Sequence, residues 1–145
     1  PYYLSYIAKE NKFDSIVTLA GRKTNNKMED FVFKKFINFI KLNNINLKSS
    51  KILIVGLTYK YGVSDMRNSL NLKIYNRIKK ITKKVYAYDP FCKESNSILN
   101  KYTSNFTKFD VVLFLTKGTI FKKIHKKIKS KKPKIILDPF YYYNN

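Results

Sequence analysis

The first third of the chain carries apolar residues at helical spacing. The opening stretch repeats them three and four residues apart, at Tyr3, Leu4, Ile7 and Ala8. A second apolar face contains Val32, Phe36, Phe39 and Ile40. These spacings predict a short helix and then a long helix within residues 14–42, interrupted or bent near Gly21. Asn25 or Asn26 either caps the second half of this helix or lies inside it.

From residue 51 the pattern changes to short apolar runs separated by amphipathic segments. The runs predict strands at residues 51–55, 85–88, 110–115 and 134–138. Two helices are predicted between them, with apolar residues at Leu70, Ile74 and Ile78 after a cap at Ser69, and at Phe121, Ile124 and Ile128. Alternating strands and helices predict a parallel sheet with right-handed crossovers. The expected fold is therefore α/β: a Rossmann-like parallel sheet with flanking helices over residues 49–145, preceded by an α-helical segment over residues 1–48.

Composition adds a strong positive charge to this picture. The 145 residues include 30 Lys and Arg against 9 Asp and Glu, a formal net charge of +21. Lysines spread over all solvated faces account for this charge, and because they are not concentrated we expect no nucleic-acid partner. The alternative is a basic α/β module that binds nucleic acid, with an affinity that falls steeply as salt rises.

The cellular setting is predicted from what the sequence does not contain. Cys92 is the single cysteine, so no internal disulfide can form, and no apolar run approaches the ~20 residues that span a bilayer. A cytoplasmic, reducing setting without a membrane partner is expected. The chain opens at Pro1 without an initiator Met or a signal segment, which we interpret as a piece of a longer protein.

Candidate chemistry concentrates in the loop after the first predicted strand, GLTYKYGVSDMRNS at residues 56–69. Ligands of open α/β sheets bind at the carboxyl ends of the strands. Lys60 can meet a phosphate or sugar oxygen as a point charge, and Arg67 can form a bidentate contact or a local salt bridge with Asp65. The loop has only Gly56 and Gly62, so the G-x-G-x-x-G fingerprint of a dinucleotide site is missing.

The stretch ILIVGLTYKYGVSDMRNSLNLKIYNRI resembles the start of the C-terminal domain of the UDP-glucose/GDP-mannose dehydrogenase family, whose pattern is roughly G-x-[AT]-[FY]-K-x-x-x-x-D-x-R-[EN]-S. The opening PYYLSYIAKENKF and the following LAGRKTNN are similar to the segment that enters that family's central dimerisation helices. YDP at 88–90 and VVLFLT at 111–116 fall in the expected order. The AGR-x-x-N stretch most resembles the branch that acts on UDP-N-acetyl-hexosamines, and the resemblance covers nearly the whole chain.

The resemblance implies the C-terminal part of an NAD-dependent nucleotide-sugar 6-dehydrogenase, which oxidises a UDP-sugar to a uronate for polysaccharide synthesis. By position, Tyr59 and Lys60 would contact the UDP-sugar and Arg67 would reach NAD, itself bound mainly by an N-terminal domain. Residues 1–48 would form a homodimer and residues 49–145 would be the UDP-sugar-binding domain. The family's catalytic Cys belongs before Pro1, so we expect no catalytic residue here; a remnant without activity of its own is the third possibility.

One departure from the family pattern lies at the last predicted strand. Family members often carry Asp-x-Arg there, with an Arg that assists substrate binding, whereas this chain has Asp138-Pro139-Phe140. The resemblance therefore predicts a substrate site that lacks this contact.

Several remaining residues have plain structural interpretations. Cys92 has no His near it in sequence, so a structural role is expected. His125 lies among lysines and is expected to be exposed and uncommitted, and with one His and one Cys no metal site is expected. Arg22 is either a helix-face residue or a substrate contact that reaches across a dimer. Tyrosines 141–143 are expected to pack over a sheet edge, and the lysine-rich run at 122–134 to form a solvated helix face.

Overall fold

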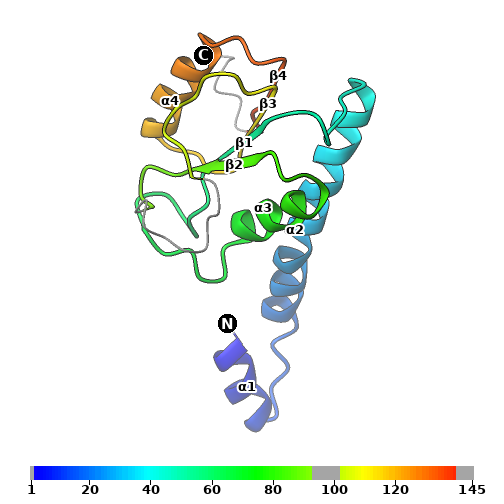
Figure 1. The fold of residues 1–145 in the computed structure, drawn as a ribbon. Coiled ribbons are helices and arrows are strands. Elements are labelled where there is room, and N and C mark those ends of the chain that lie inside the picture. The colour runs from blue at the N-terminus through cyan, green and yellow to red at the C-terminus, as the bar shows by residue number, and fades with distance from the viewer. Residues whose placement is uncertain (1, 93–101, 140–145) are drawn as a thin grey trace.

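The computed structural model describes residues 2–92 and 102–139. Two helices come first, α1 (Tyr2–Glu10) and α2 (Ile16–Leu42). They are followed by β1 (Ile52–Val55), α3 (Leu70–Ile81), β2 (Val85–Tyr88), β3 (Val111–Phe114), α4 (Thr119–Lys129) and β4 (Ile135–Leu137). Figure 1 shows the long α2 running beside α3, with α4 on the other side of the sheet. The predicted sequence of helices and strands is confirmed, with boundaries displaced by a few residues at most.

The four strands form one parallel sheet in the order β2-β1-β3-β4. Ile52 of β1 lies opposite Val85 of β2 on one side and Val111 of β3 on the other. Every residue of β1 and β3 is buried, as expected of strands covered on both faces. The predicted α/β class and Rossmann-like parallel sheet are thus confirmed.

Alternate residues of β1 serve two separate cores. Ile52 and Ile54 pack with residues of α2 and α3, whereas Leu53 and Val55 pack with α4. The side chains of all four are completely buried. Burial stabilises the fold by roughly 1.5–3 kcal/mol for each large aliphatic side chain. Both helical layers are therefore fastened to the same central strand.

Of the interruption or bend predicted near Gly21, the interruption is wrong. Helix α2 continues unbroken from Ile16 to Leu42, and both Asn25 and Asn26 lie inside it. A glycine in a helix interior costs only about 1 kcal/mol relative to alanine. The packing of Phe36 and Ile40 into the core offsets a cost of that size.

The prediction that His125 is exposed is also wrong. Only 2% of its surface is exposed, and its Nε2 lies 3.6 Å from Oδ2 of Asp138, whose side chain is equally buried. Its ring centroid lies 5.0 Å from that of Phe114. His125 follows Phe121 by four residues, so it shares the buried face of α4 despite its lysine neighbours. The carboxylate of Asp138 thus faces the interior of the described fold, beside the His125 ring.

Stability is expected to depend on pH through His125. Burial holds the pKa of His125 below its ordinary value of 6.5, and Lys129 lowers it further, against the opposing effect of Asp138. The unfolded chain therefore takes up a proton at higher pH than the folded chain does. The free energy of unfolding should fall as the pH drops below about 6.5 and level off once the folded histidine is also protonated.

Urea denaturation at pH 7.5 and 5.5 measures this effect. His125 is the single histidine of the sequence, so no other imidazole titrates in this range. His125→Gln should remove most of the difference between the two pH values. An equal difference in both proteins would assign the pH dependence to other groups.

Two further expectations concern a membrane span and a metal site. No helix among residues 2–92 and 102–139 has the length and apolarity to cross a bilayer. In the same part of the chain, no three His, Cys, Asp or Glu side chains gather as a metal-binding group.

Cys92 is buried, with its Sγ 3.7 Å from Sδ of Met66, a packing contact. Tyrosines 141–143 lie outside the described residues.

Candidate functional site

A cavity of about 900 Å³ opens where β1 and β3 end. The chain leaves β1 through α3 to reach β2 on one side, while β3 lies on the other side of β1. This reversal of direction is the point at which open α/β sheets bind ligands. The cavity is lined by Arg22, Asn25, Asn26, Tyr59, Lys60, Tyr61, Asp65, Arg67, Asn68, Leu70, Asn71, Lys73, Leu115, Thr116 and Lys117.

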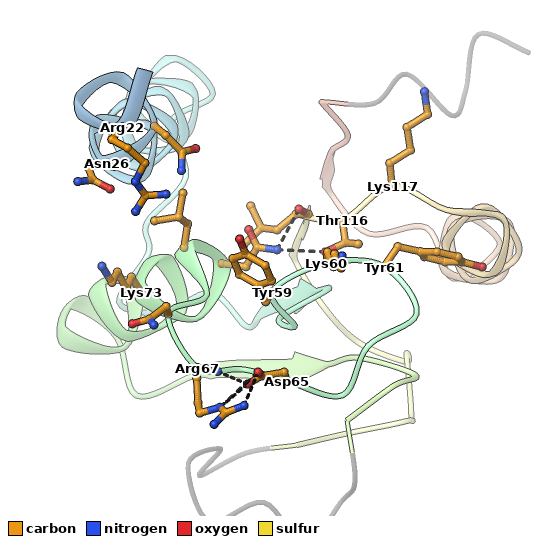
Figure 2. Close-up of a pocket in the computed structure, with 15 residues that line it drawn as sticks. Arg22, Asn26, Tyr59, Lys60, Tyr61, Asp65, Arg67, Lys73, Thr116 and Lys117 are labelled. Carbon is orange, nitrogen blue, oxygen red and sulfur yellow. Dashed lines mark hydrogen bonds and ion pairs between the residues drawn. The ribbon is translucent and has the colours of Figure 1, made fainter. Parts of the chain in front are cut away.

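The lining of this cavity is strongly cationic. Its charged residues are Arg22, Lys60, Arg67, Lys73 and Lys117, with Asp65 as the single acid. Figure 2 shows Arg22 and Asn26 on one side, Lys117 on the other, and Tyr59 and Lys60 between them. Cations that converge on a cleft raise the local concentration of an anionic ligand. A ligand with several negative charges fits this lining better than a neutral one.

The β1–α3 loop is held at its start by the buried carboxylate of Asp89. Oδ2 of Asp89 accepts hydrogen bonds from the backbone N–H groups of Leu57 and Thr58, at 2.7 and 2.9 Å, and from the Thr58 hydroxyl at 2.9 Å. Its Oδ1 accepts from the N–H of Phe91. In dinucleotide-binding folds an acid after the second strand bonds the ribose. Here that carboxylate is committed to its own loop.

The other end of the loop is held by Ser69. Its hydroxyl donates to the carbonyl of Leu57 at 2.6 Å and accepts from the N–H of Leu72, which caps α3. Within the loop, the N–H of Tyr59 donates to the carbonyl of Asp65 at 2.8 Å. Tyr59 and Lys60 are therefore presented to the cavity from a closed and fastened turn.

A close backbone approach and two hydrogen bonds form the floor of the cavity between β1 and β3. Gly56, with a φ of 91°, lies so close to the chain after β3 that a Cβ there would be 2.5 Å from Oγ1 of Thr116. Asn71 at the start of α3 donates to the carbonyl of Leu115 and to Oγ1 of Thr116, both at 3.1 Å. The two strand ends and the start of α3 are thus joined directly beneath the cavity.

Arg67 occupies a different position from Lys60. Its guanidinium forms a fork with the carboxylate of Asp65, with an Nη2–Oδ2 distance of 2.9 Å, and 88% of its side chain is exposed. The hydrogen bonds from Arg67 hold the pKa of Asp65 below its ordinary value, and Asp65 in turn raises the pKa of Arg67. In Figure 2 this pair turns away from Tyr59 and Lys60. Arg67 therefore lies at the rim, open to a partner from outside.

Helix α2 forms one wall of the cavity through Arg22, Asn25 and Asn26. Arg77 of α3 holds this wall in place one to two turns further along. Its guanidinium lies 3.8 Å from the centroid of the Phe33 ring and donates to Asp30 at 3.0 Å. The Arg22 guanidinium in turn lies 5.0 Å from the centroid of the Tyr2 ring on α1. Arg22 is thus a cavity residue as well as a helix-face residue.

Sequence reasoning found Tyr59, Lys60 and Arg67 but missed much of the lining. Thr116 and Lys117 follow directly after β3, so the rule that ligands bind at strand carboxyl ends points to them as well. Lys73 lies one turn after Ser69 on α3, where its charge looked like part of a solvated face. Asn25 closes the AGR-x-x-N stretch, but it and Asn26 were considered only as helix caps, because their place in the lining depends on how α2 packs against α3.

Comparison with known proteins shows the family to which this chain is similar. The model of the UDP-glucose/GDP-mannose dehydrogenase family, UDP binding domain, matches residues 53–145. A UDP-N-acetyl-D-mannosamine dehydrogenase of Pyrococcus horikoshii is 31% identical over 140 residues, which cover 95% of this chain and 32% of that protein. A UDP-N-acetyl-D-glucosamine 6-dehydrogenase of Salmonella typhi is 31% identical over 91 residues, 63% of this chain and 21% of that protein.

Solved structures give the same result. The UDP-N-acetyl-mannosamine dehydrogenase Cap5O of Staphylococcus aureus superposes with a TM-score of 0.71 at 26% identity, over 100% of this chain and 33% of that one. The UDP-D-ManNAc dehydrogenase of Pyrococcus horikoshii superposes with a TM-score of 0.69 at 26% identity, over 89% of this chain and 31% of that one. This chain spans about a third or less of the length of these relatives.

Proposed function

This chain belongs to the UDP-glucose/GDP-mannose dehydrogenase family, and on that premise we propose that it is the UDP-sugar-binding part of an NAD-dependent nucleotide-sugar 6-dehydrogenase. The observation that carries the proposal is the cavity at the ends of β1 and β3, with five cationic residues and one acid in its lining. A diphosphate-linked sugar supplies the negative charge that this lining lacks. Because the relatives named above act on UDP-N-acetyl-hexosamines, we propose a substrate of that class for polysaccharide precursor synthesis.

Lys60 and Tyr59 are the proposed contacts to the nucleotide sugar. Lys60 is exposed in the cavity lining and can approach a phosphate or sugar oxygen as a point charge. Tyr59 is 60% exposed, so its ring is accessible to a base or ribose. Both lie in a loop whose ends are held by Asp89 and Ser69, so little conformational freedom is lost when a ligand binds.

NAD is the proposed cofactor, and the described residues do not form a complete site for it. The turn after β1 lacks the glycine fingerprint, and Asp89 is engaged by the amides of Leu57 and Thr58. NAD would supply the hydride acceptor and would be bound mainly by an N-terminal domain of the whole enzyme. From this chain Arg67 is the proposed contact, because its exposed guanidinium stands at the rim of the cavity.

A second copy of the chain is the proposed partner of the N-terminal helices. Large apolar side chains of α1 and α2 are exposed, among them Tyr3 at 73%, Leu4 at 68% and Val17 at 86%. Exposed apolar surface of this extent marks an interaction face. We therefore assign residues 1–48 to dimerisation and residues 49–145 to binding of the UDP-sugar.

Titration of the chain with UDP-N-acetylglucosamine tests the proposed site. Lys60→Ala should weaken binding by roughly tenfold, because a charge-assisted contact in a partly open cavity is worth on the order of 1.4 kcal/mol. Lys123→Ala is the matched control, since Lys123 is an exposed lysine of α4 outside the cavity lining. Equal affinity of the unaltered chain and the Lys60 variant would contradict the assigned contact.

A further inference from the structure

Tyr61 joins two loops that border the cavity. Its ring packs edge-on against Phe91 and Phe121, with centroid distances of 5.2 and 6.1 Å. Its hydroxyl lies 3.0 Å from Oγ1 of Thr119, the first residue of α4. The same ring covers Gly118 so closely that a Cβ on Gly118 would overlap it. The β1–α3 loop and the β3–α4 loop are therefore fastened together through one aromatic ring, a contact that we call the Tyr61 latch.

Each side of the Tyr61 latch is preceded by a lysine. Lys60 comes directly before Tyr61 and Lys117 directly before Gly118, and both lysines line the cavity. Both side chains are exposed, and no salt bridge involves either of them within residues 2–92 and 102–139. Both charges are therefore available to an anionic ligand in the cavity. The latch ties together the two loops that carry them.

We propose that Lys117 is a further binding residue for the diphosphate group and that Tyr61 is the positioning residue that sets its distance from Lys60. This inference rests on the proposed function, because it assigns additional residues to the same site. A diphosphate carries charge on two phosphate groups, so two lysines on loops that the latch holds together can each approach one of them. Fixing the two loops before binding removes the ordering cost that two mobile loops would incur.

The Tyr61 latch also explains why residue 118 is a glycine. The φ of Gly118 is 162°, an extended conformation open to any residue, so backbone geometry does not select glycine there. The space does, because any larger residue would displace the Tyr61 ring. Gly118→Ala is thus a way to disturb the latch without changing either lysine or the tyrosine.

UDP is the probe for the test, with the 145-residue chain titrated calorimetrically. Lys117→Ala should weaken UDP binding by roughly fivefold, less than a full charge-assisted contact because the side chain is exposed, while Lys123→Ala should leave it unchanged. Gly118→Ala and Tyr61→Ala should each weaken it by at least as much as Lys117→Ala. Tyr61→Phe, which keeps the ring and loses only the hydroxyl, should have a smaller effect. Thermal unfolding of each variant checks that the fold is retained.

A double-mutant comparison separates positioning from a general structural role. If the latch acts through the lysines, Gly118→Ala should have no further effect on UDP affinity in a Lys60→Ala/Lys117→Ala background. The same loss in both backgrounds would overturn the positioning role. Normal UDP affinity of Lys117→Ala and Gly118→Ala, together with a loss in Lys60→Ala, would overturn this inference alone. Failure of the unaltered chain to bind UDP would overturn the proposed function and this inference together.

Discussion

Asp89→Ala is expected to lower the free energy of unfolding by about 3–5 kcal/mol and to abolish measurable UDP binding. The carboxylate accepts hydrogen bonds from the N–H groups of Leu57 and Thr58 and from the Thr58 hydroxyl. Leu57, Thr58 and Asp89 are all completely buried. Removal of the carboxylate takes its acceptor from these three donors and from the N–H of Phe91. The Thr58 hydroxyl keeps the carbonyl of Lys60 as a second acceptor, but the buried N–H groups of Leu57 and Thr58 lose theirs, each at a cost of about 1–3 kcal/mol, reduced where water enters the space.

The effect on binding follows from the position of the loop. Leu57 and Thr58 lead directly into Tyr59 and Lys60, so loss of their anchor frees the residues that face the ligand. Ser69 still holds the carbonyl of Leu57 from the other end. That single bond cannot replace the anchor, because it leaves the two N–H groups unsatisfied.

Asp110→Ala is the matched control for this prediction. Its carboxylate also accepts a backbone N–H, that of Lys51 at 2.8 Å, but its side chain is 27% exposed and lies at the opposite end of the strands. Water can replace the lost acceptor there, so its loss should cost less than about 1 kcal/mol. Urea denaturation of both variants provides the comparison. Equal losses of stability in the two variants would show that the buried anchor is not what fixes the loop.

Much of the fold was predictable because the central strands are buried on both faces. β1 and β3 read as continuous apolar runs, and α3 shows its buried face as a repeat at Leu70, Ile74 and Ile78. Strand–helix alternation then restricts the topology to a parallel sheet. Helix α2 was expected to be interrupted or bent near Gly21, and it is not interrupted. A single glycine carries too small a penalty to stop a helix that packs against a core.

The site was predictable only where it depends on local sequence. The loop after β1 was found because chain order alone places it at a strand carboxyl end, and Tyr59 and Lys60 do line the cavity. The α2 wall depends instead on the contact of Arg77 with Phe33 and Asp30, residues more than 40 positions away from it in the chain. No local pattern encodes such a contact. The burial of His125, by contrast, was predictable from local sequence. It follows Phe121 by four residues on the same helix face, but it was expected to be exposed because its neighbours are lysines.

The second large effect is expected at Gly56, which lies close against Thr116. Gly56→Ala is expected to lower the free energy of unfolding by about 3 kcal/mol and to weaken UDP binding by more than about tenfold. A residue with a Cβ at a φ of 91° is strained by on the order of 1–2 kcal/mol. The added Cβ would also lie 2.5 Å from Oγ1 and 3.0 Å from the backbone N of Thr116.

Relief of this overlap requires the ends of β1 and β3 to separate, because the added Cβ would also lie 2.6 Å from the Cβ of Thr116, an atom that side-chain rotation cannot move. Separation would break the hydrogen bonds of Asn71 to Leu115 and Thr116 and would widen the floor between Lys60 and Lys117. Binding should therefore fail together with stability. Gly21→Ala is the control, since a Cβ there meets nothing within 4 Å and alanine favours the helix by about 1 kcal/mol. If Gly56→Ala matched Gly21→Ala in urea denaturation and in UDP titration, the floor of the cavity would have to be flexible, and fixed spacing of the two lysines would lose its structural basis.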